Sequence, residues 1–551
     1  MVPIKLALLW HQHQPDYRKG NKMLLPWVRL HATKDYLEMV EHLERHPTMR
    51  ATINLVPSLI RQIEDYSLGF EDDLLTFSKK TIADLSPDER DSIQTQCLYA
   101  NYRRMIARSH RYRELYEKNQ NGEKFTDAEI RDLIVHYHLA WTGEFKRDEE
   151  PYSELIMKER DFTEADTEIL LTAHLEILKE IIPRHLKLRN SSQVELSTTP
   201  FYHPILPLLC DTDSALESTP GIILPAERYS SVEDACEQLR RSIEIHTERF
   251  GVAPNGVWPA EGSISDAALK ILCQQNIEWT ASDETVLHNS LGADLSANDD
   301  NQFEELEKYF PRIFSDTDKE IAIFFRDHGL SDKIGFEYSN WDARDAAKDF
   351  VAQCLEIRSQ IIERFGEETL EKACISVILD GENCWEYYHH NGRYFLDELY
   401  SVLEKADEIK PVTMTEAVSE IGKRNIRKLS HVVAGSWIGG NFRIWIGHAE
   451  KNRAWDCLNH ARNALTNFLS HHSVDDGRIE MAHTALLKAE GSDWFWWFGE
   501  DNASEQKQIF DELYRQHLID MYVHLHLTVP KELFEPIGTN SVGDGGAMHR
   551  A

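Results

Sequence analysis

Two acidic side chains stand where apolar stretches of strand length end. Asp380 closes the run 374–380, and Glu261 follows the run 255–259 by two residues. In a parallel α/β barrel the catalytic groups come from the carboxyl ends of strands. A pair of carboxylates beside aromatic rings is typical of enzymes that cleave glycosidic bonds. The pattern therefore predicts a barrel active site that works on sugar, with Glu261 and Asp380 as its catalytic pair.

Cleavage with retention needs one carboxylate as nucleophile and one carboxylic acid that protonates the leaving oxygen. Burial, or the charge of each group on the other, would have to keep their ionisation different. Asp283, Asp327 and Glu382 also stand at the ends of strand-like runs. Spacing alone therefore does not select the pair among these carboxylates.

His11 and His13 end the first strand-like run, two residues apart. Side chains at this spacing point to the same side of a strand, so the two imidazoles could bind a metal or hydrogen-bond to sugar hydroxyls. A metal would need further ligands, which His203 or Asp327 could supply. The sequence has no cysteine cluster and no His-Glu-x-x-His helix, and we expect no metal and no cofactor.

Tryptophans accompany these polar residues. Flat aromatic rings stack on the apolar faces of pyranose rings, and glycines beside Trp437 suggest a loop that approaches a ligand. For Trp496 and Trp497 we favour a place in the core of a helical bundle. The predicted substrate-binding residues are His11, His13, His203, Trp258, Asp283, Asp327, His328, Glu382, Trp385, Trp437, Asp493 and Trp494.

The elements that would position these residues alternate along the chain. Apolar runs of strand length lie at residues 5–10, 51–56, 193–199, 255–259, 277–281, 320–326 and 374–380, with another around Val412. Amphipathic helices separate several of them. One, at 230–250, is predicted to open with a capping box of Ser230 and Glu233 and to end at Gly251. Strands that alternate with helices pair in parallel, which predicts an α/β barrel.

Two long helical segments interrupt or follow this alternation. Residues 60–190 read as a helical insertion, with capping boxes at Ser86 and Thr126. We therefore expect a catalytic barrel at 1–420 that contains this insertion. A C-terminal helical bundle at 421–535 would complete the active site. The Gly-rich tail at 536–551 is expected to be disordered.

Composition restricts the partners. Sixty basic and 93 acidic residues among 551 give a formal charge of −33. This argues against nucleic acid and anionic membranes, whereas a neutral polymer meets no repulsion. The eight cysteines are scattered, and no signal peptide or membrane-spanning run is present, so we expect a cytoplasmic protein. The oligomeric state is left open.

Five motifs, in order along nearly the whole chain, make the sequence resemble glycoside hydrolase family 57. They are Trp10-His11-Gln12-His13-Gln14-Pro15, Thr198-Thr199-Pro200-Phe201-Tyr202-His203-Pro204, Trp258-Pro259-Ala260-Glu261, Asp380-Gly381-Glu382-Asn383 and Gly491-Ser492-Asp493-Trp494. The resemblance implies an incomplete (β/α)7 TIM-like barrel followed by a helical domain. The seven strand-like runs agree with it independently.

The resemblance also implies retaining action on α-glucans without a required metal. Glu261 would be the nucleophile and Asp380 the general acid/base. The residues implied to line the subsites are His11, His13 and His203 from the barrel, with Asp493 and Trp494 reaching in from the helical domain.

Within the family, the motifs around Asp380 and Asp493 look more like those of amylopullulanases and α-amylases than those of glucanotransferases or branching enzymes. We therefore predict an α-glucan hydrolase. A 4-α-glucanotransferase or a branching-type transglycosylase with the same pair is the alternative. Less favoured are a metal-dependent α-mannosidase or polysaccharide deacetylase that uses His11, His13 and Asp327, and a non-catalytic glycan-binding protein.

Overall fold

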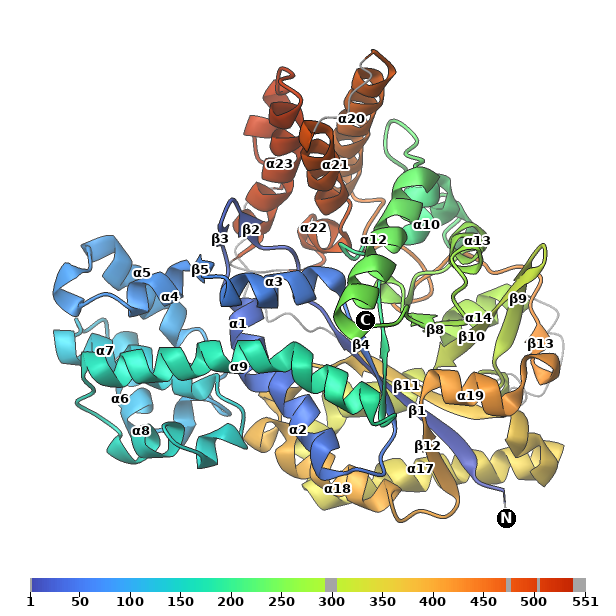
Figure 1. Ribbon diagram of the computed structural model, residues 1–551, viewed down its shortest axis with the longest axis horizontal. Helices are drawn as coiled ribbons and strands as arrows, with labels where there is room; N and C mark the ends of the chain where they lie inside the picture. The colour runs from blue at the N-terminus through green and yellow to red at the C-terminus, as the bar shows by residue number, and fades with distance from the viewer. Residues whose placement is uncertain (1, 293–304, 472–476, 503–505, 539–551) are drawn as a thin grey trace.

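The computed structural model describes residues 2–292, 305–471, 477–502 and 506–538. The predicted tail at 536–551 therefore lies mostly outside the described residues. Figure 1 shows a central sheet surrounded by helices, with one group of helices projecting to its side and another lying above it. The central sheet is the part that carries the predicted site.

Seven parallel strands form a nearly closed barrel. They are β1 (Ile4–Gln12), β4 (Ala51–Leu55), β6 (Val194–Ser197), β7 (Gly256–Val257), β8 (Trp279–Asp283), β10 (Lys319–Arg326) and β11 (Cys374–Asp380). β1 pairs with β4 and β11, β4 with β6, and β8 with β7 and β10. The bridge from Thr198 to Val257 joins β6 to β7, and the pair Arg326–Ser376 joins β10 to β11. Each predicted strand is confirmed.

The eighth predicted run forms β12 (Ile409–Val412), which pairs with Ile4–Ala7 of β1. Because β4 pairs with the later residues of β1, from Leu9 onward, β12 remains outside the ring. β9 (Arg312–Asp316) was not predicted, and it pairs antiparallel with β10. The minor strands are β2 (Arg18–Lys19), β3 (Lys22–Met23), β5 (Glu71–Asp72) and β13 (Arg427–Lys428).

Helices cover the outside of the barrel. The main ones are α1 (Trp27–His31), α2 (Leu37–Arg45), α12 (Val232–Phe250), α13 (Asp266–Gln274), α14 (Glu284–Leu291), α16 (His328–Asp332), α17 (Ala343–Phe365), α18 (Arg393–Leu403) and α19 (Met414–Ile421). Two shorter helices are α10 (Leu206–Cys210) and α11 (Ala215–Ser218). β1 is buried along its whole length, as expected for a parallel strand covered on both faces.

The predicted capping box of α12 is wrong by one residue. Ser231, not Ser230, accepts the hydrogen bond at the helix start, and its donor is the backbone N–H of Asp234. Both neighbouring serines fit the sequence pattern, and only the backbone conformation selects between them. The predicted end at Gly251, which adopts the left-handed conformation, is confirmed.

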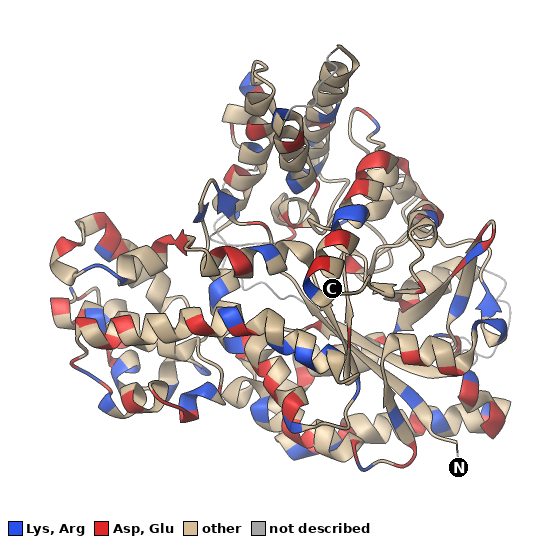
Figure 2. Ribbon diagram, in the orientation of Figure 1, with Lys and Arg blue, Asp and Glu red and all other residues tan. Residues whose placement is uncertain are grey.

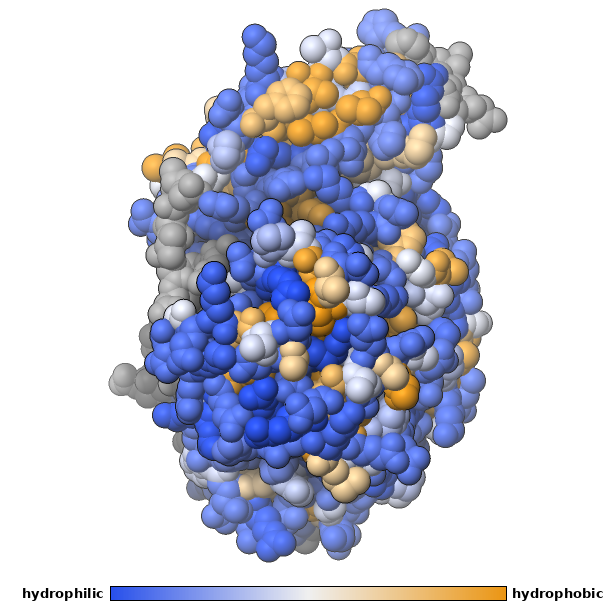
Figure 3. All heavy atoms as spheres, turned by 90° about the vertical axis from the view of Figure 1, so that its left-hand side faces the viewer, coloured by the Kyte–Doolittle hydropathy of each residue, from blue (hydrophilic) through white to orange (hydrophobic). Residues whose placement is uncertain are grey.

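The segment predicted as a helical insertion extends to the left of the barrel in Figure 1. It contains α3 (Pro57–Ser67), α4 (Asp73–Ser78), α5 (Pro87–Leu98), α6 (His110–Gln120), α7 (Asp127–Ala140), α8 (Tyr152–Lys158) and α9 (Glu164–Asn190). The capping boxes at Ser86 and Thr126 are both present. The face of the molecule on this side is largely hydrophilic, and an apolar patch lies higher up, at the level of the C-terminal helices (Figure 3).

The C-terminal helices are α20 (Ala449–His471), α21 (Gly477–Ala489), α22 (Ser492–Trp497) and α23 (Lys507–His524). Leu458 and Leu465 of α20 and Leu518 of α23 are buried within this group, as their spacing predicts. The boundary at residue 420 stays a prediction. Among the described residues, no helix combines the length and the apolar character needed to cross a membrane.

Candidate active site

A cavity of about 260 Å³ opens beside the carboxyl ends of β1, β10 and β11, beneath α22. It brings together side chains from both ends of the chain. The predicted site residues that line it are His11, His13, His203, Glu261, His328, Asp380, Glu382, Trp437 and Asp493.

Glu261 lies in a tight 3-10 turn, Ala260–Gly262, directly after β7. Its φ of 57° places it in the left-handed region, which is unfavourable for a side chain larger than glycine. The indole N–H of Trp437 donates to Oε2 of Glu261 at 2.7 Å, and the Trp437 backbone N–H donates to the Glu261 carbonyl at 2.9 Å. Burial and the charge of Asp380 raise the pKa of Glu261 to about 8, although the Trp437 hydrogen bond opposes the shift.

Asp380 is the last residue of β11 and stands beside His11 of β1 in the strand register. Nδ2 of Asn383 donates to its carboxylate at 3.0 Å. Burial raises the pKa of Asp380, while the Asn383 hydrogen bond and the charges of His13 and Arg326 oppose this effect. Because the charge of Asp380 acts on Glu261, the two carboxyl groups titrate as a coupled pair. One carboxylate and one carboxylic acid are the two forms that glycosidic cleavage requires.

Two neutral histidines form a hydrogen-bonded chain at the base of the cavity. His11 contacts Oδ1 of Asn54 through Nδ1 at 2.7 Å and Nε2 of His203 through Nε2 at 3.2 Å. Nδ1 of His203 contacts Oγ of Ser492 at 2.9 Å. Burial, followed by the charge of His13, lowers the pKa of His11 to about 3 and that of His203 well below its usual value. Both rings can therefore donate or accept hydrogen bonds without carrying charge.

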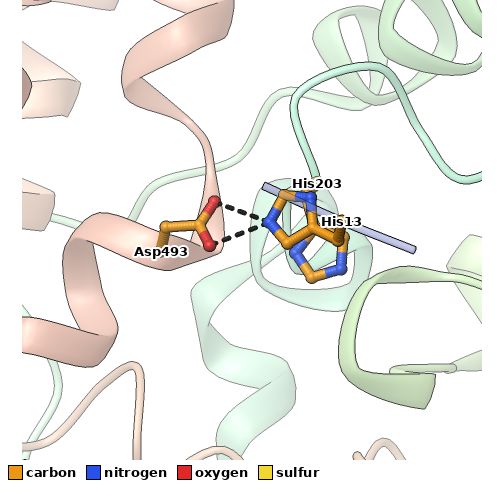
Figure 4. Close-up of side chains that lie close together, drawn as sticks. All are labelled: His13, His203 and Asp493. Carbon is orange, nitrogen blue, oxygen red and sulfur yellow. Dashed lines mark hydrogen bonds and ion pairs between the residues drawn. The ribbon is translucent and has the colours of Figure 1, made fainter. Parts of the chain in front are cut away.

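His13 connects the barrel to the C-terminal helices. Its Nε2 lies 2.9 Å and 3.1 Å from the two carboxylate oxygens of Asp493, and its ring stacks on that of His203 with centroids 3.8 Å apart. Figure 4 shows Asp493 pointing from its helix toward these stacked rings. The contact joins the first strand of the barrel to α22.

Among the described residues, His13, His203 and Asp493 form the group that could hold a cation, because their ligand atoms lie within 4.8 Å of one another. The metal-site alternative placed Asp327 with His11 and His13, and the structure does not bring these three together. Asp327 instead accepts from the Leu330 backbone N–H at 2.7 Å and from the Tyr309 hydroxyl at 2.6 Å. It caps α16 and does not line the cavity.

Glu382 presents a buried carboxyl group to the cavity, with 2% of its surface exposed. Its Oε1 accepts from the His13 backbone N–H at 3.1 Å and from the Tyr36 hydroxyl at 3.2 Å. Oε2 has no hydrogen-bond partner among the described residues. Burial and the charge of Asp380 raise the pKa of Glu382 well above its usual value. In its neutral form this group can donate to a ligand hydroxyl.

A network of charges forms the wall beside Trp437. Hydrogen bonds to Asp283 and Asp332 raise the pKa of His328 to about 10. Arg326 donates from Nη2 to Asp332 at 2.7 Å, and its guanidinium lies 5.3 Å from the centre of the Trp437 ring. Asp283 lies behind this wall, where it caps α14. It supports the lining residues and does not itself line the cavity.

Arg326 and Asp332 line the cavity but were not predicted. The alternation of side chains along a strand would have indicated Arg326, because residues two apart share a face. Arg326 therefore shares a face with His328, which lines the cavity. Asp327, between them, points elsewhere.

Three predicted tryptophans lie behind the cavity and do not line it. Each has at most 1% of its surface exposed. Trp258 packs edge-on against Trp437 with ring centroids 5.3 Å apart. The indole N–H of Trp385 donates to the Gly381 carbonyl at 2.9 Å, and that of Trp494 donates to the Lys488 carbonyl at 2.7 Å. These three tryptophans hold the backbone of the site motifs, and their buried positions do not favour direct contact with a ligand.

Trp496 and Trp497, predicted in the bundle core, pack against that core and also line the cavity. Both are half-buried. The sequence Trp494–Trp497 belongs to the short helix α22 (Ser492–Trp497), in which neighbouring side chains point in different directions. The aromatic residues that face the cavity therefore could not be identified without the orientation of this helix.

Comparisons with known proteins identify the family and the fold. Residues 7–431 match the family model described as glycosyl hydrolase family 57. A search of curated proteins gives no match.

Several solved structures share the fold. A branching enzyme from Pyrococcus horikoshii is 15% identical, with 98% of each chain covered and a TM-score of 0.59. A branching enzyme from Thermococcus kodakaraensis is 14% identical, with 95% of this chain and 90% of that chain covered and a TM-score of 0.59. The α-amylase AmyC from Thermotoga maritima is 14% identical, with 97% and 95% covered and a TM-score of 0.57.

At these identities the structural matches establish the fold, and the family model adds the membership. The region matched by the family model includes His11, Glu261 and Asp380. The chain therefore belongs to glycosyl hydrolase family 57.

Proposed function

We propose that the protein is a retaining glycosidase that cleaves the α-glucosidic bonds of α-glucans such as starch, glycogen and maltooligosaccharides. The observation that carries the proposal is the meeting of Glu261 and Asp380 in one cavity, where the charge of Asp380 raises the pKa of Glu261. The family membership supports the class of reaction. The α-amylase AmyC among the structures of the same fold agrees with an α-glucan substrate.

In the first step, an oxygen of ionised Glu261 forms a bond to the anomeric carbon as the glycosidic bond breaks. Asp380 gives its proton to the departing oxygen, so that the leaving chain is released as an alcohol. In the second step, water attacks the anomeric carbon and the bond to Glu261 breaks. The Asp380 carboxylate takes the proton from that water, which restores both groups.

The surrounding groups suit a neutral sugar. Burial favours the neutral forms of His11 and His203, which therefore place no charge beside a sugar hydroxyl. Oε2 of Glu382, which has no hydrogen-bond partner among the described residues, can hydrogen-bond to such a hydroxyl. The Trp496 and Trp497 side chains at the cavity wall can pack against sugar rings. This mechanism routes no step through a metal or a cofactor.

A transglycosylase is the second candidate, because the same pair would serve a sugar acceptor in place of water. The aromatic lining supports it, since Trp496, Trp497 and Phe510 together present apolar surface on which an acceptor chain could lie. Two of the structures with the same fold are branching enzymes. Product analysis distinguishes the two functions.

The test is chromatography of the products from maltoheptaose, with and without EDTA, for the wild type and Glu261→Gln. We expect shorter oligosaccharides, no effect of EDTA, and at least about a 1,000-fold loss of turnover in the variant. Glu278→Gln is the matched control, because Glu278 is exposed and outside the cavity.

Each other outcome changes the assignment. Chains longer than the substrate would identify a transglycosylase. Loss of activity with EDTA that zinc restores would assign a metal to His13, His203 and Asp493. Turnover above a few per cent in Glu261→Gln would reject Glu261 as the nucleophile.

A further inference from the structure

A second cavity, of about 360 Å³, is lined by basic side chains alone. They come from three separate parts of the chain: the link between α5 and α6, the residues after α7, and the segment between β11 and α18. The lining residues are Arg103, Arg104, Arg108, Arg147, His389 and His390. In a chain with a formal charge of −33, such a concentration of positive charge departs from the general surface, on which acidic residues lie along most helices (Figure 2).

Most of this positive charge lacks a carboxylate partner. Arg104 donates to two backbone carbonyls, from Nε to Tyr387 at 2.8 Å and from Nη2 to Ser339 at 3.2 Å. Arg147 donates to the Leu139 carbonyl. Among the described residues, no ion pair joins Arg103, Arg104 or Arg147 to an acidic side chain.

Glu144 is the acidic group bonded to this lining. Its carboxylate pairs with Arg108 and also lies 3.1 Å from Nδ1 of His390. Among the described residues, Glu144 is therefore the one carboxylate that forms ion pairs with the lining side chains.

The basic groups of the lining also act on one another. Burial and the charge of Arg108 lower the pKa of Arg147 to about 10. Burial and the charge of Arg103 lower the pKa of Arg104. Burial, followed by the charge of Arg104, lowers the pKa of His389. Mutual repulsion of this kind is relieved when an anion binds between the groups.

We propose that this cavity binds the phosphate group of a small molecule. Planar guanidinium groups match the geometry of phosphate oxygens and can bind them through two hydrogen bonds each. A long polyanion is disfavoured, because the rest of the acidic surface would repel it. The proposal concerns a site distinct from the catalytic cavity and does not depend on the proposed function.

An adjoining cavity of about 130 Å³ provides room for the rest of such a molecule. It shares Arg108 and Arg147 with the basic cavity and adds the side chains of Tyr112, His136 and Leu139. Polar and aromatic groups of this kind suit a sugar or a nucleoside attached to the phosphate.

The site contacts the segment that carries the catalytic acid. Arg104 holds the Tyr387 carbonyl, and His390 and Asn391 adopt left-handed backbone conformations, with φ of 50° and 53°. The side chain of Asn391 donates to Glu38 of α2 at 2.5 Å. A ligand that bridges Arg103 and His390 would fasten the insertion to the chain that follows Asp380.

The experiment is isothermal titration calorimetry of the full-length protein at constant ionic strength, with inorganic phosphate, glucose 1-phosphate and ADP as separate probes. The variants are Arg103→Gln and Arg103→Glu, because Arg103 is exposed and its side chain forms no hydrogen bond with the part of the chain that the structure describes. We expect Kd to rise about 10-fold in Arg103→Gln and binding to be lost in Arg103→Glu.

The control is the double variant Arg61→Gln/Arg240→Gln, whose side chains lie on α3 and α12 and are 42% and 48% exposed. Its Kd should match that of the wild type. Equal affinities for phosphate and both esters would identify free phosphate as the ligand, and tighter binding of one ester would identify a sugar phosphate or a nucleotide. Absence of binding by all three probes at 10 mM, or the same Kd in the Arg103 variants, would overturn the proposal.

Discussion

The protonation of a single residue, Glu261, decides whether the proposed reaction can begin. Its carboxyl is buried and lies near Asp380, and both conditions favour the neutral form. The hydrogen bond from Trp437 is the contact that favours the ionised, nucleophilic form. Trp437 is therefore a positioning residue that acts through Glu261.

Replacing Trp437 with Phe tests this role. The ring that packs against Trp258 is kept, whereas the 2.7 Å hydrogen bond to Glu261 is lost. Loss of a bond to the carboxylate raises the pKa of Glu261 further, so Glu261 keeps its proton to higher pH and the productive form becomes rarer. We expect the profile of kcat/KM against pH to shift upward by up to about one unit and its maximum to fall about 10-fold. An unmoved profile, or a shift to lower pH, would contradict this account.

Residue types at strand ends identified the catalytic pair and the three histidines as candidates, because strand ends of a parallel barrel meet at one edge. Asp493 was identified from the family motif at 491–494. Side-chain direction is what the sequence left open. Asp327 and Arg326 are adjacent, and only the pleat of β10 decides which of them faces the cavity. For Trp494 and Trp496 the same choice depends on how α22 is rotated.

At the scale of the elements, the strands were predictable because buried parallel strands are nearly continuous apolar runs. The helices of the insertion were predictable from their capping residues. β9 was missed because its sequence, Arg312–Asp316, mixes charged and apolar residues and is stabilised by pairing with β10. β9 therefore depends on a tertiary contact that the local sequence pattern does not indicate.

β7 is two residues long, and its contact with β8 depends on a glycine. A Cβ atom at Gly256 would lie 1.8 Å from Cε2 of Trp279. The indole cannot move aside freely, because its N–H donates to Glu195 at 2.7 Å and the ring is fully buried. This packing fixes the strand that leads to Glu261.

Gly256→Ala should therefore destabilise the fold by about 2 kcal/mol or more and lower activity through displacement of Glu261. Thermal unfolding and kcat measured on the same samples would check both effects. Gly477→Ala is the control, since nothing lies within 4 Å of a Cβ at the start of α21 and alanine favours a helix. Equal stability of the two variants would show that the barrel adjusts around Trp279.

At the scale of the whole molecule, the C-terminal helices close the site over the barrel. Gly491 forms a bridge with Pro204, and the Ser492 backbone N–H donates to the His203 carbonyl at 2.9 Å. Asp493 then reaches His13, which lies 480 positions earlier in the chain. The sequence suggested that this helical domain completes the site, but pairings over such separations are set by the fold alone.

If His13 and Asp493 act as one unit, their substitutions should not be additive. Either His13→Asn or Asp493→Asn breaks the same contact, so each alone should lower kcat/KM about 10-fold. The kcat/KM of the double variant should be no lower than that of the less active single variant. Multiplication of the two effects would instead mean that each side chain contacts the substrate independently.

Thermal unfolding of the same four proteins separates the explanations further. A contact that only holds the helices to the barrel would show its coupling in stability, whereas one that also orients substrate would show it in kcat/KM at unchanged stability.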